Sequence, residues 1–141
     1  MDKTVVLDTS IIVSALIGKK GLSCEVLRRC LMGEFKPIIS NALYCKYQDV
    51  TNRKNILKLC PLSIDEIQEL LNAFYSIAQW VSIHYLWRPN LIDESDNFII
   101  ELALAGNANT IITNNIRDFK NSEISFPELT IITPETLLRG E

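Results

Sequence analysis

Short apolar segments rich in β-branched residues alternate with amphipathic segments of helical period along this chain. The apolar segments are too short for typical helices, and Val, Ile and Thr favour strands. The predicted strands are residues 4–7, 36–39, 80–85, 110–113 and 129–132. Strands that alternate with helices favour a mostly parallel sheet with helices on both faces. We therefore expect an α/β protein, a three-layer α/β/α sandwich around a central sheet.

The predicted helices follow from apolar periodicity and from residues that favour helix ends. They cover residues 11–17, 23–32, 40–53, 63–79, 93–105 and a short stretch from 134, with a loop over 54–61. Ser63 and Glu66 have the spacing of a capping box, and Ser23 is expected to cap its own helix. Asn107 should end a helix in the left-handed conformation. Pro37 donates no ladder hydrogen bond, which places the start of its strand at a margin of the sheet.

The size and composition predict one globular domain over residues 1–141. The chain is 48% hydrophobic and 22% charged, as in soluble proteins. Its longest apolar runs fall short of the roughly 18 to 20 residues that span a bilayer, so we expect no membrane partner. The amino terminus lacks the pattern of a secretory signal, which predicts a cytoplasmic location. The four cysteines form no C-x-x-C pair and His84 is the only histidine, which disfavours a structural zinc site.

Charge is distributed unevenly along the chain. The net charge of −3 is not that of a general nucleic-acid binder. Between residues 36 and 58, however, five basic residues face one acid, whereas between 59 and 101 one basic residue faces seven acids. An acidic pocket beside a basic rim suits metal binding next to a phosphate backbone. Ordinary solvated helix faces give the same pattern, so both interpretations stay open.

Acidic and amide side chains follow two of the predicted strands and open one of the helices. Asp8 follows the first strand, Asn115 and Asp118 follow the fourth, and Asp93 and Asp96 begin a helix. The carboxyl ends of parallel strands meet at one edge of a sheet, where ligands bind. Carboxylate and amide oxygens bind hard divalent cations, and such cations drive phosphodiester hydrolysis. We therefore expect a crevice that holds Mg²⁺ or Mn²⁺.

Within this set, Asp8 and Asp96 are the strongest candidates for metal ligands. Asp96 lies one step deeper in its helix, whereas Asp93 is better placed to cap it. Ser10 adds a hydroxyl group to the same site. Each motif alone also fits a structural role, because Asp is a common helix cap and two adjacent Asn residues are ordinary in a turn.

Three motifs, taken in order, resemble the PIN-domain family, and most closely its VapC-like branch, the toxins of bacterial toxin–antitoxin pairs. They are Leu7–Ser10, Asp93–Asn97 and Thr113–Phe119. The resemblance covers nearly the whole chain and includes the late segment Ile132–Glu135. It implies an α/β/α sandwich, a Mg²⁺- or Mn²⁺-dependent endoribonuclease that takes RNA as substrate, a homodimer, and a small cognate antitoxin that occupies the cleft.

Carried over by position, Asp8 matches the first acid of the family and Asp96 the third. Asn115 falls where many members have a fourth acid and some have Asn, and Asp118 lies just beyond it. The second family acid, a Glu in the helix after the second strand, falls on Lys46. At the second acidic position this sequence therefore departs from the family pattern.

A lysine at this position opposes the binding of a cation. Two unit charges about 4 Å apart interact by roughly 4 kcal/mol at an effective dielectric of 20, and the ion carries two charges. Either the site binds metal weakly, or Asp49 one turn later acts as the catalytic acid, or Lys46 points away. Alternatively, Lys46 neutralises Asp8 and Asp96, which would leave a catalytically degenerate binding module of the same fold.

Basic residues near the expected crevice are candidates for RNA binding. Arg53, Lys54 and Arg117 are expected to position RNA through its phosphates. A third interpretation, a flavodoxin- or receiver-like phosphate or nucleotide binder, is disfavoured because no glycine-rich loop follows the first strand.

Overall fold

A parallel sheet forms the centre of the protein in the computed structural model, which describes residues 3–18, 21–82, 97–119 and 126–139. The five strands have the order β3-β2-β1-β4-β5, and every neighbouring pair is parallel. They are β1 (Lys3–Leu7), β2 (Phe35–Ile39), β3 (Gln79–Trp80), β4 (Thr110–Ile112) and β5 (Thr130–Ile132). The predicted α/β class with a mostly parallel sheet is therefore confirmed.

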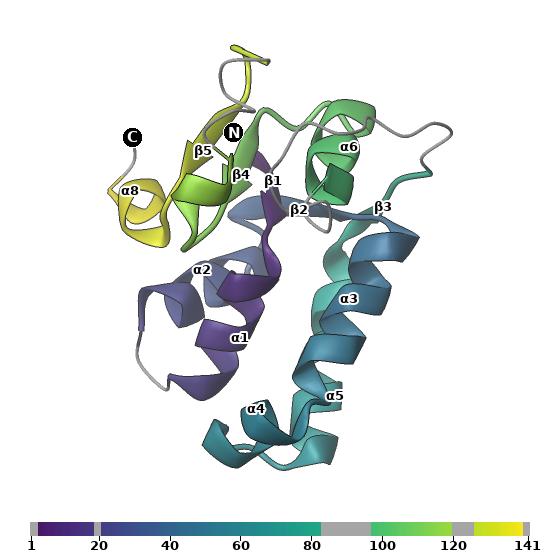
Figure 1. The fold of residues 1–141 in the computed structure, drawn as a ribbon, viewed down its shortest axis with the longest axis vertical. Helices are drawn as coiled ribbons and strands as arrows, with labels where there is room; N and C mark the ends of the chain where they lie inside the picture. The colour runs from purple at the N-terminus through teal and green to yellow at the C-terminus, as the bar shows by residue number, and fades with distance from the viewer. Residues whose placement is uncertain (1–2, 19–20, 83–96, 120–125, 140–141) are drawn as a thin grey trace.

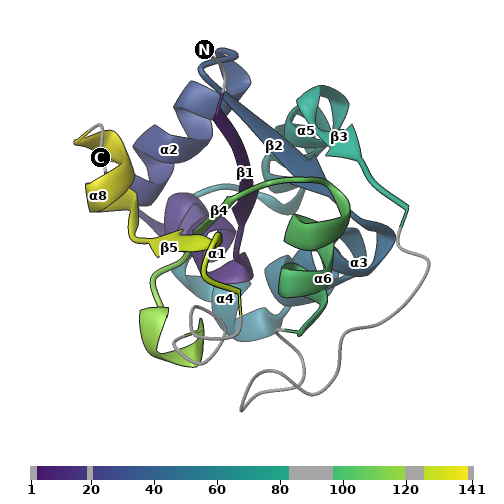
Figure 2. The same ribbon diagram turned by 90° about the horizontal axis from the view of Figure 1, so that it is seen from above.

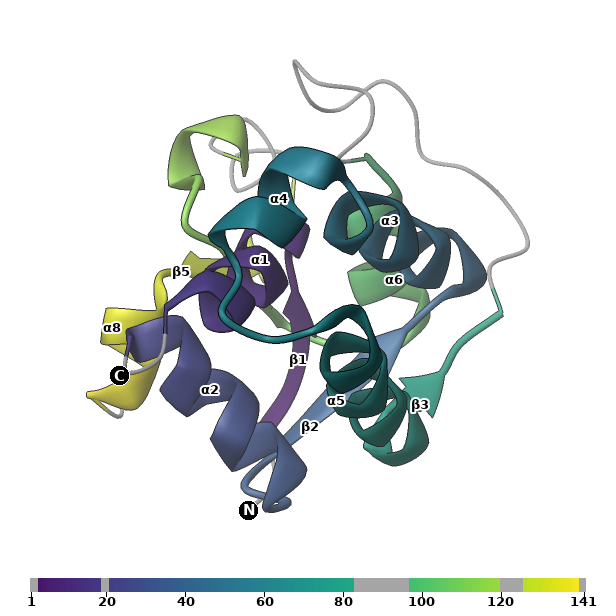
Figure 3. The same ribbon diagram turned by 90° about the horizontal axis from the view of Figure 1, so that it is seen from below.

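Helices cover the sheet from both sides. The described helices are α1 (Thr9–Ile17), α2 (Leu22–Leu31), α3 (Asn41–Thr51), α4 (Lys54–Leu59), α5 (Ile64–Ile77), α6 (Asn97–Ala105), α8 (Pro134–Leu138) and the 3₁₀ helix η2 (Ile116–Phe119). From above, α6 lies in front of the strands and contacts β1, β2 and β4 (Figure 2). From below, α1, α2 and α5 lie in front of them, and these helices contact β1 and β2 (Figure 3). The fold thus has three layers, as predicted.

The central strand β1 is buried on both faces. Val5, Val6 and Leu7 have no exposed surface. Because helices cover both sides, this strand is a continuous apolar run and does not alternate with polar residues. On α3, Leu43, Tyr47 and Val50 recur at helical spacing and pack into the same core.

The strand order creates a crevice at the carboxyl ends of β1 and β4. From β1 the chain passes to β2 on one side, while β4 and β5 lie on the other side. In such sheets the neighbouring connections leave in opposite directions at this point, which opens a space for ligands. The residues that follow β1 and β4 therefore meet at one edge.

Several predicted helix ends agree with the structure. Ser63 and Glu66 form the capping box of α5, and Asn107 is left-handed with φ 58°. Pro37 pairs with Val5 of β1, but β3 pairs only with the last two residues of β2. Pro37 therefore lies where β2 has a partner on one side only, as its missing N–H requires.

Other expectations about local structure are corrected. Helix α2 begins one residue earlier than predicted, with Gly21 as its N-cap, so that Ser23 lies inside the helix and does not cap it. Residues 54–59 form α4 where a loop was expected, because this stretch holds neither Gly nor Pro to prevent a turn of helix. Within the described residues, no helix is both long enough and apolar enough to cross a bilayer.

Candidate functional site

Asp8 follows β1 directly and lies at the base of the crevice. Its residue is 5% exposed, and its backbone N–H donates to the carbonyl of Ile112 at 2.9 Å, which extends the pairing of β1 with β4. Asp8 is also the N-cap of α1, because its Oδ1 accepts the Thr9 N–H at 2.8 Å. The end of a buried strand and the start of a helix thus fix this carboxylate.

Two hydroxyl groups tie the other carboxylate oxygen to the β4 side of the crevice. Oδ2 of Asp8 accepts hydrogen bonds from Ser10 Oγ at 2.9 Å and from Thr113 Oγ1 at 2.7 Å. The same hydroxyls accept the backbone N–H groups of Asn114 and Asn115, at 3.2 and 2.9 Å. Each hydroxyl therefore donates to Asp8 and accepts from the turn after β4, which holds this turn against the carboxylate.

This network leaves part of the carboxylate available. An ionised carboxylate has about four acceptor sites, and Oδ2 uses two of them while Oδ1 uses one. Among contacts with described residues, the remaining site lies on Oδ1. It could accept a further hydrogen bond or bind a cation.

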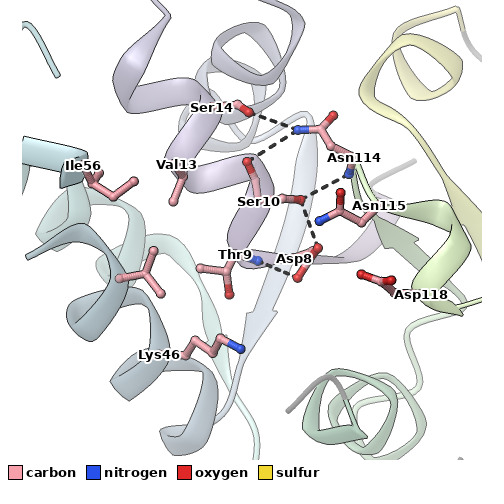
Figure 4. A pocket seen from close by; sticks show the side chains of 11 residues that line it. Asp8, Thr9, Ser10, Val13, Ser14, Lys46, Ile56, Asn114, Asn115 and Asp118 are labelled. Atoms are coloured by element: carbon pink, nitrogen blue, oxygen red, sulfur yellow. Dashed lines mark hydrogen bonds between the residues drawn. The ribbon is translucent and has the colours of Figure 1, made fainter. Parts of the chain in front are cut away.

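Lys46 approaches the same crevice from α3. Ser40 caps this helix by accepting the Leu43 N–H at 3.2 Å. The buried hydroxyl of Tyr47 donates to the carbonyl of Leu7 at 2.5 Å, which anchors α3 beside the end of β1. Burial and the nearby charge of Asp8 raise the pKa of Tyr47 well above its ordinary value, so the hydroxyl stays a donor. The adjacent Lys46 extends from α3 toward the Asp8 side of the crevice (Figure 4).

The crevice is a cavity of about 460 Å³. Polar residues from the end of β1, from α1 and α3, and from the turn after β4 and η2 line it together with three apolar side chains. The polar ones are Asp8, Thr9, Ser10, Ser14, Lys46, Asn114, Asn115 and Asp118, and the apolar ones are Val13, Val50 and Ile56. Figure 4 shows Asp8 and Asp118 on neighbouring sides of this space. Residues far apart in the sequence, Asp8, Ser10, Lys46, Asn115 and Asp118, thus share one cavity.

Some of the sequence candidates lie elsewhere. Asp49 is absent from the cavity lining, and its side chain is 68% exposed and pairs with Arg53 at 2.9 Å. It therefore does not occupy the place of the second acid. Lys54, at the start of α4, and Arg117, in η2, are exposed. Asp93 and Asp96 lie outside the described residues.

Two residues of the site belong to the motif Thr113–Phe119, but neither was singled out as a candidate from the sequence. Thr113 is fully buried and bridges Asp8 to Asn115. Asn114 is exposed, and its Nδ2 donates to Ser14 Oγ at 3.1 Å. A signal for Thr113 existed, since a hydroxyl residue directly after a buried strand must find a hydrogen-bond partner.

The oxygen donors among the described residues meet part of what a magnesium ion requires. Mg²⁺ is usually held by one or two carboxylates and keeps several waters, and Asp8 and Asp118 supply two carboxylates while Asn115 adds an amide. Within the described ranges, no three or more His, Cys, Asp or Glu side chains lie together where they could hold a metal ion. The ammonium of Lys46 lines the same cavity and opposes a cation.

Comparison with known proteins gives a match to one family and to one solved fold. The family model described as PIN domain matches residues 4–117. A search of curated proteins gave no match. Among solved structures, the chain is similar to one described as the crystal structure of VapBC2 from Rickettsia felis bound to a DNA fragment from their promoter, with a TM-score of 0.62 and 22% identity. The likeness covers 92% of this chain and 98% of the other, and at this identity it shows a shared fold.

Proposed function

Because this chain belongs to the PIN domain family, we propose that it is a metal-dependent endoribonuclease. The observation that carries the proposal is the buried Asp8, which three hydrogen bonds orient at the sheet edge while one acceptor site has no partner among the described residues. A carboxylate fixed in this way is pre-organised for a cation and needs little rearrangement to bind it. Residues 1–141 would act as one domain.

The proposed metal ligands are Asp8 and, from the family resemblance alone, Asp96. Asp118 and Asn115 line the same cavity and would complete the oxygen donors, directly or through water. Ser10 would act by orienting Asp8, to which it donates at 2.9 Å. Asp93 would cap its helix. Bound Mg²⁺ or Mn²⁺ would supply an activated water and offset the charge on a scissile phosphate.

Basic residues around the crevice would hold the RNA by its phosphates. Arg117 follows Asn115 in η2, and Lys54 begins α4, whose Ile56 lines the cavity. Contacts of this kind fix the register of a nucleic acid without reading its bases. Arg53 is the weaker candidate, because its guanidinium group already pairs with Asp49.

We further propose that the protein is the toxin of a toxin–antitoxin pair, that it forms a homodimer and that it acts in the cytoplasm. Support comes from the similarity to the VapBC2 structure, whose description names a complex bound to promoter DNA. A small open reading frame directly beside the gene, whose product co-purifies with this chain, would be the expected antitoxin. Co-expression of the two should restore growth that the chain alone inhibits.

A second candidate function is a catalytically degenerate binding module. The observation that favours it is Lys46, which lines the cavity at the position of a family acid. Its positive charge would offset the negative charge of the carboxylates in place of a metal ion, so that they lie close together without metal. Such a protein would bind RNA or an antitoxin and would not hydrolyse the RNA.

The two candidate functions differ in whether the protein cleaves RNA. As a nuclease, the wild-type protein should cleave a single-stranded RNA in the presence of Mg²⁺ or Mn²⁺, and cleavage should stop when EDTA is added. Asp8→Asn should lower the rate by more than the roughly 10- to 100-fold typical of a residue that only orients a metal ligand. Asp49→Asn is the matched control, because Asp49 is exposed and lies outside the cavity lining. Equal rates for wild type and Asp8→Asn would refute the nuclease, and RNA binding without cleavage would favour the degenerate module.

A further inference from the structure

Lys46 brings a positive charge into the cavity that holds the candidate site. Among the described residues that line this cavity, the charged side chains are Asp8, Asp118 and Lys46. A phosphodiester is an anion, so the two carboxylates on their own would repel it. The ammonium group that opposes a metal ion is therefore also the group that favours a phosphate in the same cavity.

Lys46 and Asp118 lie on opposite sides of Asp8. The helix α3, which carries Lys46, follows β2, whereas η2, which carries Asp118, follows β4. These two strands flank β1 in the sheet. Figure 4 shows the same arrangement, with Asp8 between the side chains of Lys46 and Asp118. The described carboxylates thus lie at the centre and on the β4 side of the cavity, and the ammonium group lies on the β2 side.

An independent observation points to a ligand on the β2 side. Thr9 is only 7% exposed and lines the cavity, and its Oγ1 is buried without a hydrogen-bond partner among the described residues. Figure 4 shows this hydroxyl on the side of Asp8 that faces Lys46. Buried hydroxyl groups nearly always have a partner. Because Thr in a helix adopts two χ1 rotamers, a rotation would turn the hydroxyl toward an anionic oxygen held by Lys46.

We propose that Lys46 binds a non-bridging oxygen of the scissile phosphate, with the Thr9 hydroxyl as a second donor to the same phosphate. The inference rests on the proposed function and adds to it a catalytic residue that contacts the substrate. In sites with two metal ions, both ions stabilise the charge that develops during the displacement. Here the ammonium group would take the place of one of them. The bond from Tyr47 to the Leu7 carbonyl fixes the helix that carries this lysine.

Three substitutions separate the charge of Lys46 from its size and test the hydroxyl of Thr9. Lys46→Gln removes the charge, Lys46→Arg keeps it, and Thr9→Val replaces the hydroxyl by a methyl group. Lys36→Gln is the matched control, because the exposed Lys36 lies in the first half of β2, outside the cavity lining. Thermal melts check folding. Thr9→Val should melt at or above the wild-type temperature, since it removes a buried hydroxyl without a partner.

The first measurement is RNA binding without metal. A short fluorescent single-stranded RNA is titrated by anisotropy in EDTA at several salt concentrations. Lys46→Gln should bind about tenfold more weakly than wild type, and the slope of log K against log salt should be smaller by about 0.7, the value for one phosphate contact on a single strand. Thr9→Val should bind about fivefold more weakly with an unchanged slope, because its hydroxyl is neutral. Lys46→Arg and Lys36→Gln should bind like wild type.

The second measurement compares metal affinity with cleavage. Calorimetry without RNA should show that Lys46→Gln binds Mn²⁺ more tightly than wild type, whereas at saturating Mn²⁺ it should cleave RNA about 100-fold more slowly. Tighter Mn²⁺ binding together with faster cleavage would show that Lys46 only repels the ion, which would overturn the inference and leave the nuclease standing. Unchanged RNA affinity and salt slope in Lys46→Gln would also overturn it. A wild-type protein that cleaves no RNA at any Mn²⁺ concentration would overturn both proposals.

Discussion

The hydroxyl of Thr113 donates a 2.7 Å hydrogen bond to Oδ2 of Asp8, although the two residues lie 105 positions apart. This contact joins the end of β4 to the end of β1. It explains why the turn after β4 belongs to the same site as Asp8, since Thr113 also accepts the Asn115 N–H at 2.9 Å. The carboxylate and the turn are therefore coupled through one buried side chain.

Thr113→Val tests this coupling. Valine has nearly the same shape but neither donates to Asp8 nor accepts the Asn115 amide. Loss of a buried hydrogen bond to a charged group should lower the free energy of unfolding by about 1 to 3 kcal/mol. Urea denaturation measures this change. Thr130→Val is the matched control, because Thr130 is exposed on β5, and it should stay within about 0.5 kcal/mol of wild type. Equal stability of the two variants would contradict the coupling.

Tyr47→Phe tests how α3 is anchored beside β1. The substitution removes the buried hydrogen bond to the Leu7 carbonyl and leaves the ring in place. We expect a loss of about 1 to 3 kcal/mol in the free energy of unfolding, the cost of a buried group without a partner. Thermal melts would measure it. Tyr44→Phe should change stability much less, because the contact of the Tyr44 hydroxyl within the described residues is a long one of 3.5 Å with Gln48. A neutral Tyr47→Phe variant would show that the bond does not anchor the helix.

Lys46→Glu should restore the family acid and tighten divalent-metal binding. The ammonium group lines the same cavity as Asp8, so its replacement removes a repulsion and adds a ligand. At a metal concentration about 100 times the dissociation constant, binding should add roughly 2.7 kcal/mol of stability. Melting temperatures with and without millimolar Mg²⁺ or Mn²⁺ measure the gain. Lys46→Gln, which only removes the charge, should give an intermediate shift. Identical shifts in all three proteins would mean that Lys46 does not influence the metal.

Glu25 makes stability depend on pH in the acid range. Hydrogen bonds from Arg28 and Arg29 lower the pKa of Glu25 to about 2. Because the folded-state pKa is depressed, the contribution of Glu25 is complete above its ordinary value of 4.5 and disappears as the pH falls toward 2. Glu25→Gln should therefore be slightly less stable than wild type at pH 7, and equally stable near pH 2. The urea midpoints of both proteins, measured across this pH range, would show whether their stabilities converge. A stability difference that stays constant with pH would refute this role for Glu25.

Cys30 should be chemically inert in the folded protein. Burial raises the pKa of its thiol to about 12, so almost no thiolate exists at pH 8, and the thiolate is the reactive form. Iodoacetamide at pH 8 should leave Cys30 unmodified by mass spectrometry while the exposed Cys45 reacts. In denaturant both should react alike. Rapid modification of native Cys30 would show that this part of the core opens readily.

The fold could be predicted from local patterns, because each local preference agrees with the global arrangement. The capping box at Ser63 and the left-handed Asn107 are examples. Helix starts without such a pattern were harder to predict. Ser23 has good N-cap chemistry, yet Gly21 is the cap and Ser23 faces a cavity. The hydrogen-bond partner of a serine depends on tertiary neighbours that the sequence does not reveal.

The site was only partly predictable for the same reason. Asp8 follows β1 and Asn115 follows β4, and both residues line one crevice, as expected from the parallel topology. Asp49, the candidate for the missing acid, is exposed and lies outside the cavity lining. Residues three and four positions apart both lie near one face of a helix. The structure shows that Val50 lines the cavity with Lys46, whereas Asp49 pairs with Arg53 outside it. Periodicity alone does not decide between these neighbours.

The central claim is that Asp8 holds a divalent cation in the crevice. Isothermal titration of Mn²⁺ into the wild-type protein and into Asp8→Asn tests it most directly, because the method reads binding without any substrate. We expect one binding event in the wild type and its loss in Asp8→Asn, with Asp49→Asn unchanged. Binding of equal affinity in wild type and Asp8→Asn, or no binding to the wild type, would contradict it.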